Sequence, residues 1–557
     1  MRNLGHDCQQ VIFLVKTASN LTFLVALLVT IQILGTTVAQ AQSTGTVDFG
    51  TQLRQIDGFG VADPFGRGAY LVNSPAISQQ VIDQLFNPVT GAGLSMLRIG
   101  LNTDTNIEPN APPTPTSTPT YVWDGMDGGQ VWVAQQAVKY GVKRFYADSW
   151  GAPDFMKTNN DQNNGGAICG VPNTACATGD WRQAYANYLV QFATFYQQSG
   201  VPITDLSFVN EPDENVSYTS MVLSTAQVVD FVKVFGPTVQ VSSLHVNLNC
   251  CDLTNWSGAR TYTTAVSNDP VASTYVNIFT GHEYGALATT PLPTTKKTWM
   301  SEWASANATA YNATWDIPST AQNDGMHLAN DISNALREGN VSAYIYWYAA
   351  STGATGGMIQ LSATSDATSF IVTKRLFALA GFARFVQPGA YRAPASTNNN
   401  NLNITAFTNA NGSKVINIVN NATTVVTANP TLDPGTANAV ASSYFTDEND
   451  TIAPTNAAQV SGQTLTATLA PRSLTSILLA PPVVNGIVQL AVSPNLTLQG
   501  DGSYQAAVKV SNVGTGTAQN VMLEQPSASA SKPLVRAVAL RWSSVRAPNI
   551  RNKPYRD

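Results

Sequence analysis

Short, continuous apolar runs recur along the first two thirds of the chain, separated by longer amphipathic stretches. Runs of this length are typical of strands that are buried on both faces. The stretch at 180–196 instead repeats Trp181, Tyr185, Leu189 and Tyr196 at helical spacing. Eight apolar runs predict strands at 56–60, 94–101, 144–150, 205–211, 239–246, 278–284, 298–303 and 343–348. Because strands that alternate with helices pair in parallel, eight repeats predict an α/β fold, a closed (β/α)8 TIM barrel.

An open, doubly wound parallel sheet is the alternative fold for the same alternation. Sheets of that kind that bind dinucleotides carry a Gly-x-Gly-x-x-Gly turn after a strand. No such turn follows any of the eight runs, and no phosphate-binding Gly-x-x-x-x-Gly-Lys run occurs. We therefore favour the barrel and expect no cofactor.

The pattern changes at about residue 389 to short β-rich runs separated by Asn, Gly and Pro, which is typical of a β-sandwich. One or two short strands are also expected at 47–53. Runs at 488–492, 504–511 and 521–524 predict part of an immunoglobulin-like β module with too few strands to close a sandwich. The predicted division is a signal peptide at 1–41, first strands of a side β-domain at 42–55, the catalytic barrel at 56–388, the side β-sandwich at 389–480, a linker at 481–486, the partial immunoglobulin-like module at 487–526 and a basic, disordered tail at 527–557.

The beginning of the chain predicts export. Basic residues precede an apolar segment at 21–34, which is followed by Ala39-Gln40-Ala41, a small-x-small pattern typical of a cleaved signal peptide. A membrane anchor is the alternative, but the apolar segment is shorter than the roughly 20 residues needed to span. Charged residues make up 11% of the chain and the net charge is −5, which gives no reason to expect nucleic acid as a partner. We expect a secreted, extracellular monomer with no membrane association after cleavage.

Four cysteines follow the predicted signal peptide, an even number that suits an oxidising compartment. Cys169 and Cys176 flank a loop rich in Gly, Pro and Asn and are expected to form a local disulfide. Cys250 and Cys251 are adjacent, so they either bond to each other or pair elsewhere. Zinc is the alternative use of these thiols, but no Cys-x-x-Cys spacing supports it, and no metal is expected.

Two glutamates stand at the ends of predicted strands. Glu211 ends the run at 205–211, where Pro212 prevents the strand from continuing, and Glu302 lies at the end of 298–303. Because α/β barrels place their chemistry at the carboxyl ends of strands, the two side chains are expected to meet. Hydrolysis of a glycosidic bond requires such a pair: Glu211 as general acid and base, and Glu302 as nucleophile. A separation of about 5 Å implies retention of configuration and a wider one implies inversion. The alternative for either glutamate is an exposed strand end or a salt bridge.

Other polar and aromatic residues cluster at neighbouring strand ends. Asn210 is expected to hydrogen-bond a sugar hydroxyl, and His282 and Tyr284 are expected to orient Glu302. Arg98 is expected to hold Glu302 ionised through a charge-assisted bond. The substrate-binding prediction also includes Trp150 and Trp347, which offer flat faces for sugar rings or, alternatively, pack in the core.

These motifs, taken together, resemble glycoside hydrolase family 30, closest to its largely fungal xylanase subfamily. The resemblance covers about residues 47–479 and implies a barrel with a side β-sandwich to which the early strands contribute. It also implies a retaining mechanism with Glu211 as acid/base and Glu302 as nucleophile. Relatives of this kind often recognise a glucuronyl branch through arginine; Arg67 is the candidate here, or else it is a structural ion-pair partner. The motifs are Ile56-Asp57-Gly58-Phe59-Gly60, Leu97-Arg98-Ile99-Gly100, Gly179-Asp180-Trp181-Arg182, Val209-Asn210-Glu211-Pro212, Cys250-Cys251-Asp252 and Trp299-Met300-Ser301-Glu302.

The resulting hypothesis is a secreted retaining hydrolase of β-linked hemicellulose, an endo-β-1,4-xylanase whose partner is xylan or a related polysaccharide. A second enzymatic hypothesis keeps the two glutamates and changes the substrate to β-1,6-glucan or β-1,6-galactan. A non-catalytic carbohydrate-binding protein is the third.

Overall fold

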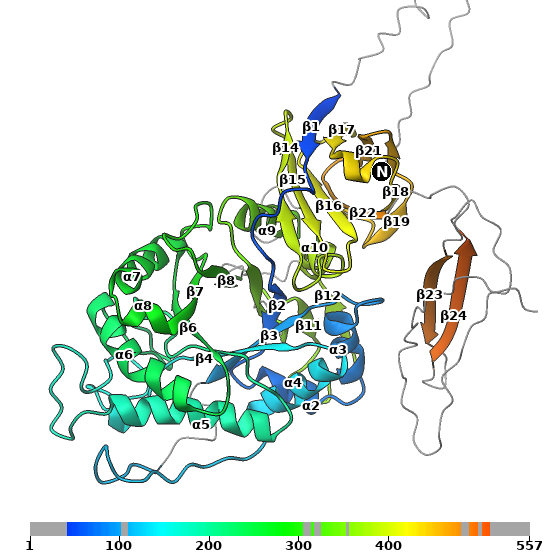
Figure 1. Ribbon diagram of the computed structural model, residues 1–557. Helices are drawn as coiled ribbons and strands as arrows, with labels where there is room; N and C mark the ends of the chain where they lie inside the picture. The colour runs from blue at the N-terminus through cyan, green and yellow to red at the C-terminus, as the bar shows by residue number, and fades with distance from the viewer. Residues whose placement is uncertain are drawn as a thin grey trace, which may run out of the picture. The chain divides into compact units, whose positions relative to one another are not determined.

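The computed structural model describes residues 42–101, 110–304, 314–316, 325–352, 356–480, 490–498 and 504–512. Eight parallel strands, β2 to β9 in chain order, form a closed barrel (Figure 1). This confirms the predicted α/β barrel. The barrel strands are β2 Gly58–Ala62, β3 Met96–Leu101, β4 Arg144–Ser149, β5 Asp205–Leu206, β6 Asn247–Leu253, β7 Val276–His282, β8 Lys297–Glu302 and β9 Ala343–Tyr348.

Helices follow most barrel strands and bury one face each. In α5, Tyr185, Leu189, Phe192 and Tyr196 are buried, as their spacing predicts. The helices are α2 Arg67–Val72, α3 Ser78–Phe86, α4 Gln130–Lys139, α5 Arg182–Gln198, α6 Thr225–Val241, α7 Trp256–Asn268, α8 Ala272–Tyr275, α9 Gly325–Arg337 and α10 Lys374–Ala383, with short 3-10 turns at Asp127–Gly129, Asp154–Met156 and Pro434–Thr436. A small sheet of β10 Ala350–Thr352, β11 Ile359–Leu361 and β12 Phe370–Val372 follows the last barrel strand.

The fifth barrel strand does not lie where its apolar run predicts. Residues 239–241 end helix α6, whose buried Phe231 and Phe235 continue at helical spacing to Val239, and Val241 is 85% exposed. The strand is β6, Asn247–Leu253. The β-branched run was misleading because the apolar face of the helix extends into it, and tertiary packing overrides local β propensity.

Two mostly antiparallel sheets follow the barrel, as the change of pattern at 389 predicts. One orders its strands β13-β15-β16-β22-β18-β19 and the other β14-β1-β17-β21-β20. A separate apolar core includes Val47, Ile404, Ile416, Leu465 and Ile477. The strands are β1 Ser43–Val47, β13 Tyr391–Ala393, β14 Ala395–Thr397, β15 Leu402–Thr408, β16 Lys414–Asn420, β17 Val426–Leu432, β18 Val440–Thr446, β19 Ala453–Thr455, β20 Ala458–Ser461, β21 Thr464–Leu469 and β22 Ser473–Ala480.

The early strand lies before the expected 47–53. Strand β1 pairs in parallel with β17 and antiparallel with β14, and it ends at Val47. The side chain of Asp48 then accepts hydrogen bonds from the Gly50 amide and the Thr51 hydroxyl, which turns the chain out of the sheet. The prediction of strand at 47–53 was therefore wrong, although the contribution of the early chain to this sheet is present.

A second unit of the chain begins at Val483. Within it, β23 Leu490–Leu498 and β24 Tyr504–Asn512 form a two-stranded antiparallel sheet. The expected strand at 521–524, the signal peptide at 1–41, the linker at 481–486 and the tail at 527–557 lie outside the described residues. Among the helices of the described residues, none is long and apolar enough to cross a membrane.

Candidate active site

Glu211 and Glu302 meet at the carboxyl end of the barrel. Glu302 is the last residue of β8 and Glu211 follows β5, the seventh and fourth barrel strands. One oxygen of each carboxylate and one ring nitrogen of His282 lie within 4.8 Å of one another. Both carboxylates line a cleft of about 820 Å³. Of the buried acids near the barrel axis, these two therefore face a space in which a ligand fits.

The backbone at Glu211 departs from ordinary strand geometry. Its φ is 46°, a left-handed conformation that costs about 1–3 kcal/mol in a residue other than glycine. The Glu211 amide donates to the carbonyl of Asp252 at 2.8 Å, which holds this conformation in place. The turn directs the carboxylate out of the strand line and into the cleft.

Arg98, on β3, is 1% exposed and connects several acceptors. One terminal nitrogen donates to Glu302 Oε2, as the sequence predicts. The other donates at 2.6 Å to Asp148 Oδ2 and at 2.6 Å to Asn210 Oδ1. Because the surrounding carboxylates outweigh the cost of burial, the pKa of Arg98 lies well above its ordinary value and the guanidinium stays charged. The oxygen of Asn210 is thus engaged by Arg98, a contact that the sequence did not predict.

Tyr284 and His282 contact different glutamates. The Tyr284 hydroxyl donates to Glu302 Oε1 at 2.9 Å, as expected. His282 was expected to orient Glu302, but its Nδ1 lies 2.9 Å from Glu211 Oε1, and its Nε2 is 4.0 Å from Glu302 Oε2. The expectation was wrong because His282, the last residue of β7, turns its Nδ1 to Glu211, while Tyr284, two residues beyond the strand, reaches Glu302.

The pKa values follow from burial and from the balance of charges. Burial alone would lower the pKa of His282, but Glu302, Asp252 and Glu211 together raise it to about 10, so the imidazole is a cation at neutral pH. The pKa of Glu211 is raised, first by burial and further by the charge of Glu302, against the opposing effect of His282. This arrangement favours a proton on Glu211, whereas Glu302 accepts a hydrogen bond from the charged Arg98.

Asp252 is a member of the site that the sequence reasoning missed. It lies in β6 and accepts hydrogen bonds from Tyr146, from Thr280 at 2.9 Å and from Ser301 at 2.6 Å. Burial raises its pKa, but His282, whose Nε2 lies 3.5 Å from Asp252 Oδ1, and the charge of Arg98 bring it down to about 2. Placing the fifth strand too early hid this residue, although Cys250-Cys251-Asp252 has the same form as the other two sites: a buried run that ends in an acid.

Asp148, in β4, is the fourth carboxylate of the group. Burial and the neighbouring Asp252 raise its pKa to about 7, against the hydrogen bond from Arg98. It is fully buried and accepts from Arg98 at 2.6 Å. Its position behind Arg98, rather than in the cleft, indicates a positioning contact.

Aromatic side chains form the floor of the cleft. Trp150 and Trp347 line it, but they are only 2% and 9% exposed and pack against each other with ring centroids 5.6 Å apart. Phe65 packs edge-on against Trp150 at 5.3 Å. The sequence left stacking on sugar rings and core packing open, and the low exposure shows that most of each indole is engaged in packing.

Arg67 stands at the edge of the same cleft. Its guanidinium carbon lies 3.7 Å from the centroid of the Tyr348 ring, and its Nε donates to Ser351 Oγ at 3.3 Å. Asp63 is buried nearby with its pKa raised to about 7 by burial, against the charge of Arg67. Arg67 is therefore held by an aromatic face and a hydroxyl with part of its surface toward the cleft.

Two loops pair beside the cleft, and we call residues 157–168 and 212–222 the rim loops; the second of them lines the cleft. Lys157 is 1% exposed and donates its ammonium to the carbonyls of Gln162 at 2.9 Å and Ser220 at 2.6 Å. The Asn164 amide donates to the Val216 carbonyl at 2.9 Å. Tyr218 of the second rim loop lines the cleft and is 46% exposed. The buried lysine thus positions an exposed aromatic side chain that the sequence reasoning did not identify.

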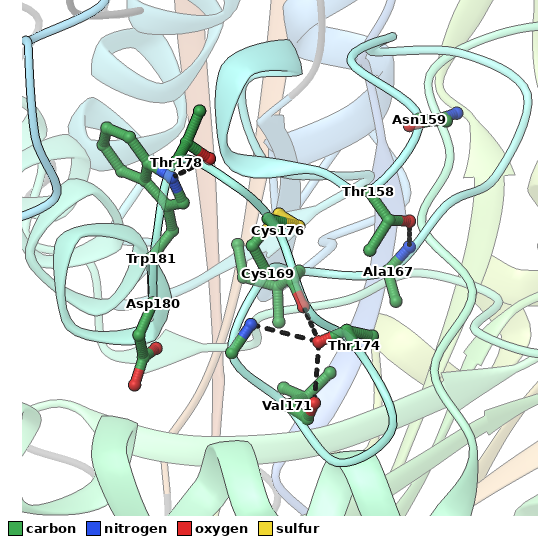
Figure 2. The surroundings of a disulfide bond; sticks show 12 residues. Thr158, Asn159, Ala167, Cys169, Val171, Thr174, Cys176, Thr178, Asp180 and Trp181 are labelled. Atoms are coloured by element: carbon green, nitrogen blue, oxygen red, sulfur yellow. Dashed lines mark hydrogen bonds between the residues drawn. A yellow bond between two sulfur atoms is a disulfide. The ribbon is translucent and has the colours of Figure 1, made fainter.

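A disulfide closes the loop that follows the first rim loop (Figure 2). Cys169 and Cys176 are bonded with their Cα atoms 5.7 Å apart, as predicted. The Thr174 hydroxyl, drawn beside them, donates to Val171 O at 2.7 Å. Cys169 N donates to Met156 O at 2.9 Å, which ties the bridge to the base of the rim loop. Cys250 and Cys251, whose pairing the sequence left open, are bonded to each other.

Glu211, His282 and Glu302 form the group of possible metal ligands among the described residues. His282 already carries a positive charge against Glu211, and Arg98 donates to Glu302. A further cation would meet two existing positive charges at short range. The donor set therefore fits proton transfer better than metal binding.

The comparisons with known proteins agree with this geometry. The family model described as the glycosyl hydrolase family 30 TIM-barrel domain matches residues 130–369. The catalytic domain of a family 30 xylanase C from Talaromyces cellulolyticus is 37% identical, with a TM-score of 0.74, over 78% of this chain and 100% of that one. The glucuronoxylanase XynC of Bacillus subtilis is 26% identical over 356 residues, 62% of this chain and 76% of the relative.

A further solved structure shows the fold at greater distance. A family 30 subfamily 8 xylanase from Clostridium acetobutylicum is 22% identical, with a TM-score of 0.61, over 79% of this chain and 99% of that one. The identity to the Talaromyces domain over that domain's whole length, together with the matching family model, decides the classification. The chain belongs to glycoside hydrolase family 30 and is a glycoside hydrolase.

Proposed function

We propose that the protein is a secreted, retaining endo-β-1,4-xylanase in which Glu302 is the nucleophile and Glu211 the general acid and base. The observation that carries the proposal is the approach of the two carboxylate oxygens to within 4.8 Å at the cleft. Retaining glycosidases hold their carboxyl groups about 5–5.5 Å apart, whereas inverting ones leave about 6.5–9.5 Å for a water molecule. The short separation favours a covalent intermediate.

In the first step, a Glu302 oxygen attacks the anomeric carbon of the sugar while Glu211 gives its proton to the departing glycosidic oxygen. The raised pKa of Glu211 keeps that proton available. Arg98 and Tyr284 each donate to one oxygen of Glu302, which orients the carboxylate for attack. The product of this step is a glycosyl ester on Glu302 and a released chain end.

In the second step, water attacks the anomeric carbon and Glu211, now ionised, accepts its proton. His282 is a cation in contact with Glu211 and stabilises the ionised state that this step requires. Asn210, fixed by Arg98 through its oxygen, presents its amide group beside the reacting sugar. The sugar is released with the configuration it had in the polymer.

The relatives named xylanase and glucuronoxylanase support xylan as the substrate. The cleft of about 820 Å³, with Tyr218 exposed at its wall, suits a saccharide, since tyrosine faces stack on sugar rings. Export is supported by the apolar segment at 21–34 and by the two disulfides, which suit an oxidising compartment.

The test compares the wild-type protein with Glu302→Gln on linear xylan, glucuronoxylan, β-1,6-glucan and β-1,6-galactan, with chromatography of the products. Wild type is expected to release oligosaccharides from xylan, and Glu302→Gln to be about 10⁴-fold slower or worse because the covalent route is lost. Glu214→Gln, the same change at an exposed acid of the same cleft, is the matched control and is expected to stay within a few-fold of wild type. Release from a β-1,6-linked polymer alone would contradict the substrate, and no release from any polymer would contradict the function.

A further inference from the structure

A second cavity, of about 690 Å³, lies at the amino end of β8 and β9 and is lined by cationic side chains. We call it the arginine pocket, defined by Arg54, Lys297, Arg337, Asn340 and Arg392. Arg54 Nε donates to the Asn340 carbonyl at 3.0 Å, and an Arg392 terminal nitrogen donates to Asn340 Oδ1 at 3.1 Å. Both guanidinium groups therefore hydrogen-bond to the same residue, Asn340.

The backbone also holds these two arginines side by side. The Arg392 amide donates to the Arg54 carbonyl at 2.9 Å, and the Leu53 amide donates to the Arg392 carbonyl at 2.8 Å. Arg54 NH1 additionally donates to the Lys296 carbonyl at 3.1 Å. The main-chain bonds keep the two residues adjacent, and the side-chain bonds to Asn340 and Lys296 hold the guanidinium groups.

The carboxylates that form ion pairs at the pocket do so with its other two cations. Lys297 lies 2.6 Å from Asp57, and Arg337 lies 2.8 Å from Glu338. Within the described part of the chain, neither Arg54 nor Arg392 has a carboxylate within ion-pair distance. In the same residues, the buried Nε of Arg392 has no hydrogen-bond partner.

The pKa of Arg392 reflects these surroundings. Burial lowers its pKa to about 10, and the positive charges of Arg54 and Arg337 lower it further in the same direction. The pKa of Arg54 is also lowered by burial, against the opposing charge of Asp57. A guanidinium group that is half-buried among like charges is stabilised by an oxyanion, which accepts charge-assisted hydrogen bonds from its terminal nitrogens.

We propose that the arginine pocket binds an oxyanion, either the carboxylate of an acidic sugar or inorganic phosphate, held between Arg54 and Arg392. The pocket lies at the end of the barrel opposite the cleft, so this binding does not depend on the glycosidase chemistry. Carboxylate and phosphate share the geometry that a guanidinium fork recognises, and the experiment separates them.

The experiment is thermal denaturation at constant pH and ionic strength, with sodium chloride as the baseline and millimolar sodium glucuronate or sodium phosphate as the probe. Binding to the folded protein raises Tm along a saturating curve. General stabilisation by excluded phosphate does not saturate at such concentrations. A saturating rise with at least one probe is the expected result.

Arg392→Gln is the decisive variant because glutamine retains an amide that can donate to Asn340. The concentration of probe needed for half of the Tm shift is expected to rise about 10-fold or more, since one charge-assisted fork is lost. In chloride alone, its Tm is expected to equal or exceed that of wild type because a like charge has been removed. Lys139→Gln, which removes one positive charge from an exposed side chain of α4, is the control and should leave the probe response unchanged.

A larger response to glucuronate assigns the pocket to an acidic sugar, and a larger response to phosphate assigns it to the free ion. The proposal is overturned if neither probe exceeds chloride. It is also overturned if Arg392→Gln lowers Tm equally in every buffer and keeps the wild-type response, as a purely structural arginine would. Because the readout requires no hydrolysis, these results stand whether or not xylan is the substrate.

Discussion

The two ends of the barrel each contain an arginine that contacts carboxylates and a tryptophan; the one at the carboxyl end is buried and the one at the amino end is partly exposed. At the amino end, Arg144 lies 2.8 Å from Asp57 and 2.9 Å from Asp205, with its guanidinium 4.6 Å from the Trp299 ring. At the carboxyl end, Arg98 lies 4.9 Å from the Trp150 ring. At both ends of the barrel, an arginine thus contacts carboxylates and the ring of a tryptophan.

The balance of charges differs. At the amino end, Asp57 is held by both Arg144 and Lys297, so each acid has a cation. At the carboxyl end, the carboxylates of Asp148, Glu211, Asp252 and Glu302 share two cations, Arg98 and His282. Because the carboxylates outnumber the cations, the protonated form of some carboxylates is favoured. The pKa of Asp148 is about 7, and that of Glu211 is raised.

A cavity alone does not distinguish the two ends, because one of about 590 Å³ is lined by Asp57 and Arg144. The useful difference is a surplus of carboxylates around shared cations: two of them, Glu211 and Glu302, face a cleft, and the pKa of Glu211 is raised. An arginine that pairs with carboxylates indicates, by itself, only a stabilising ion pair. Neighbouring carboxylates whose pKa values differ indicate a catalytic site.

The largest effect is expected from matched changes to the two arginines. Arg98→Lys keeps a charge but loses the fork that holds Glu302 and Asp148, so kcat should fall about 100-fold. Arg144→Lys should leave kcat within about twofold and lower stability by about 1–3 kcal/mol, since only structural ion pairs are weakened. Steady-state kinetics and thermal denaturation of both variants check the prediction. Equal losses of kcat would remove the distinction between the two ends.

A smaller effect is expected from His282→Gln, which removes the cation beside Glu211. The proton on Glu211 is needed for the first step, so kcat/KM falls as pH rises through the pKa of Glu211. His282 lowers that pKa, and its loss should move the alkaline limb of the pH–rate profile to higher pH. The maximum of kcat should fall about tenfold with the lost charge-assisted hydrogen bond.

His327→Gln is the control for that profile. His327 pairs with Asp331 at 3.0 Å and does not line the cleft. Its replacement should leave the alkaline limb in place. A limb that moves to lower pH in His282→Gln would show that the imidazole does not act on Glu211 as the contacts indicate.

The smallest effect is expected from Lys157→Met, which loosens the rim loops. Without its two carbonyl contacts, Tyr218 is less well positioned, and KM for long xylo-oligosaccharides should rise about threefold with little change in kcat. Lys143→Met, at an exposed lysine before β4, is the matched control. Equal KM changes for a short aryl xylobioside and for a long oligosaccharide would argue against a role for the loop wall in binding the polymer.

The sequence predicts most of the barrel because buried parallel strands leave a clear signal, a continuous apolar run. It also predicts the meeting of Glu211, Glu302, Arg98 and Tyr284, because all of them stand at or near strand ends that face the same edge. The fifth strand was misplaced where the apolar face of α6 runs into β-branched residues. That error concealed Asp252.

Other parts of the site depend on contacts that sequence does not encode locally. His282 contacts Glu211 across the barrel, and no residue pattern along the chain predicts which of the two glutamates it meets. Lys157 and Ser220 lie far apart in the chain and meet because two loops pair. The charge balance at Arg54 and Arg392 similarly depends on backbone pairing between distant segments.

The most direct test of the central claim is to trap the reaction on the enzyme. A 2-deoxy-2-fluoro xylobioside with a good leaving group forms the glycosyl ester quickly and hydrolyses slowly, so the adduct accumulates in a retaining enzyme. Mass spectrometry of the digested protein is expected to find one disaccharide on the peptide that contains Glu302. An active enzyme that forms no adduct, or that carries the sugar on another residue, would contradict the account.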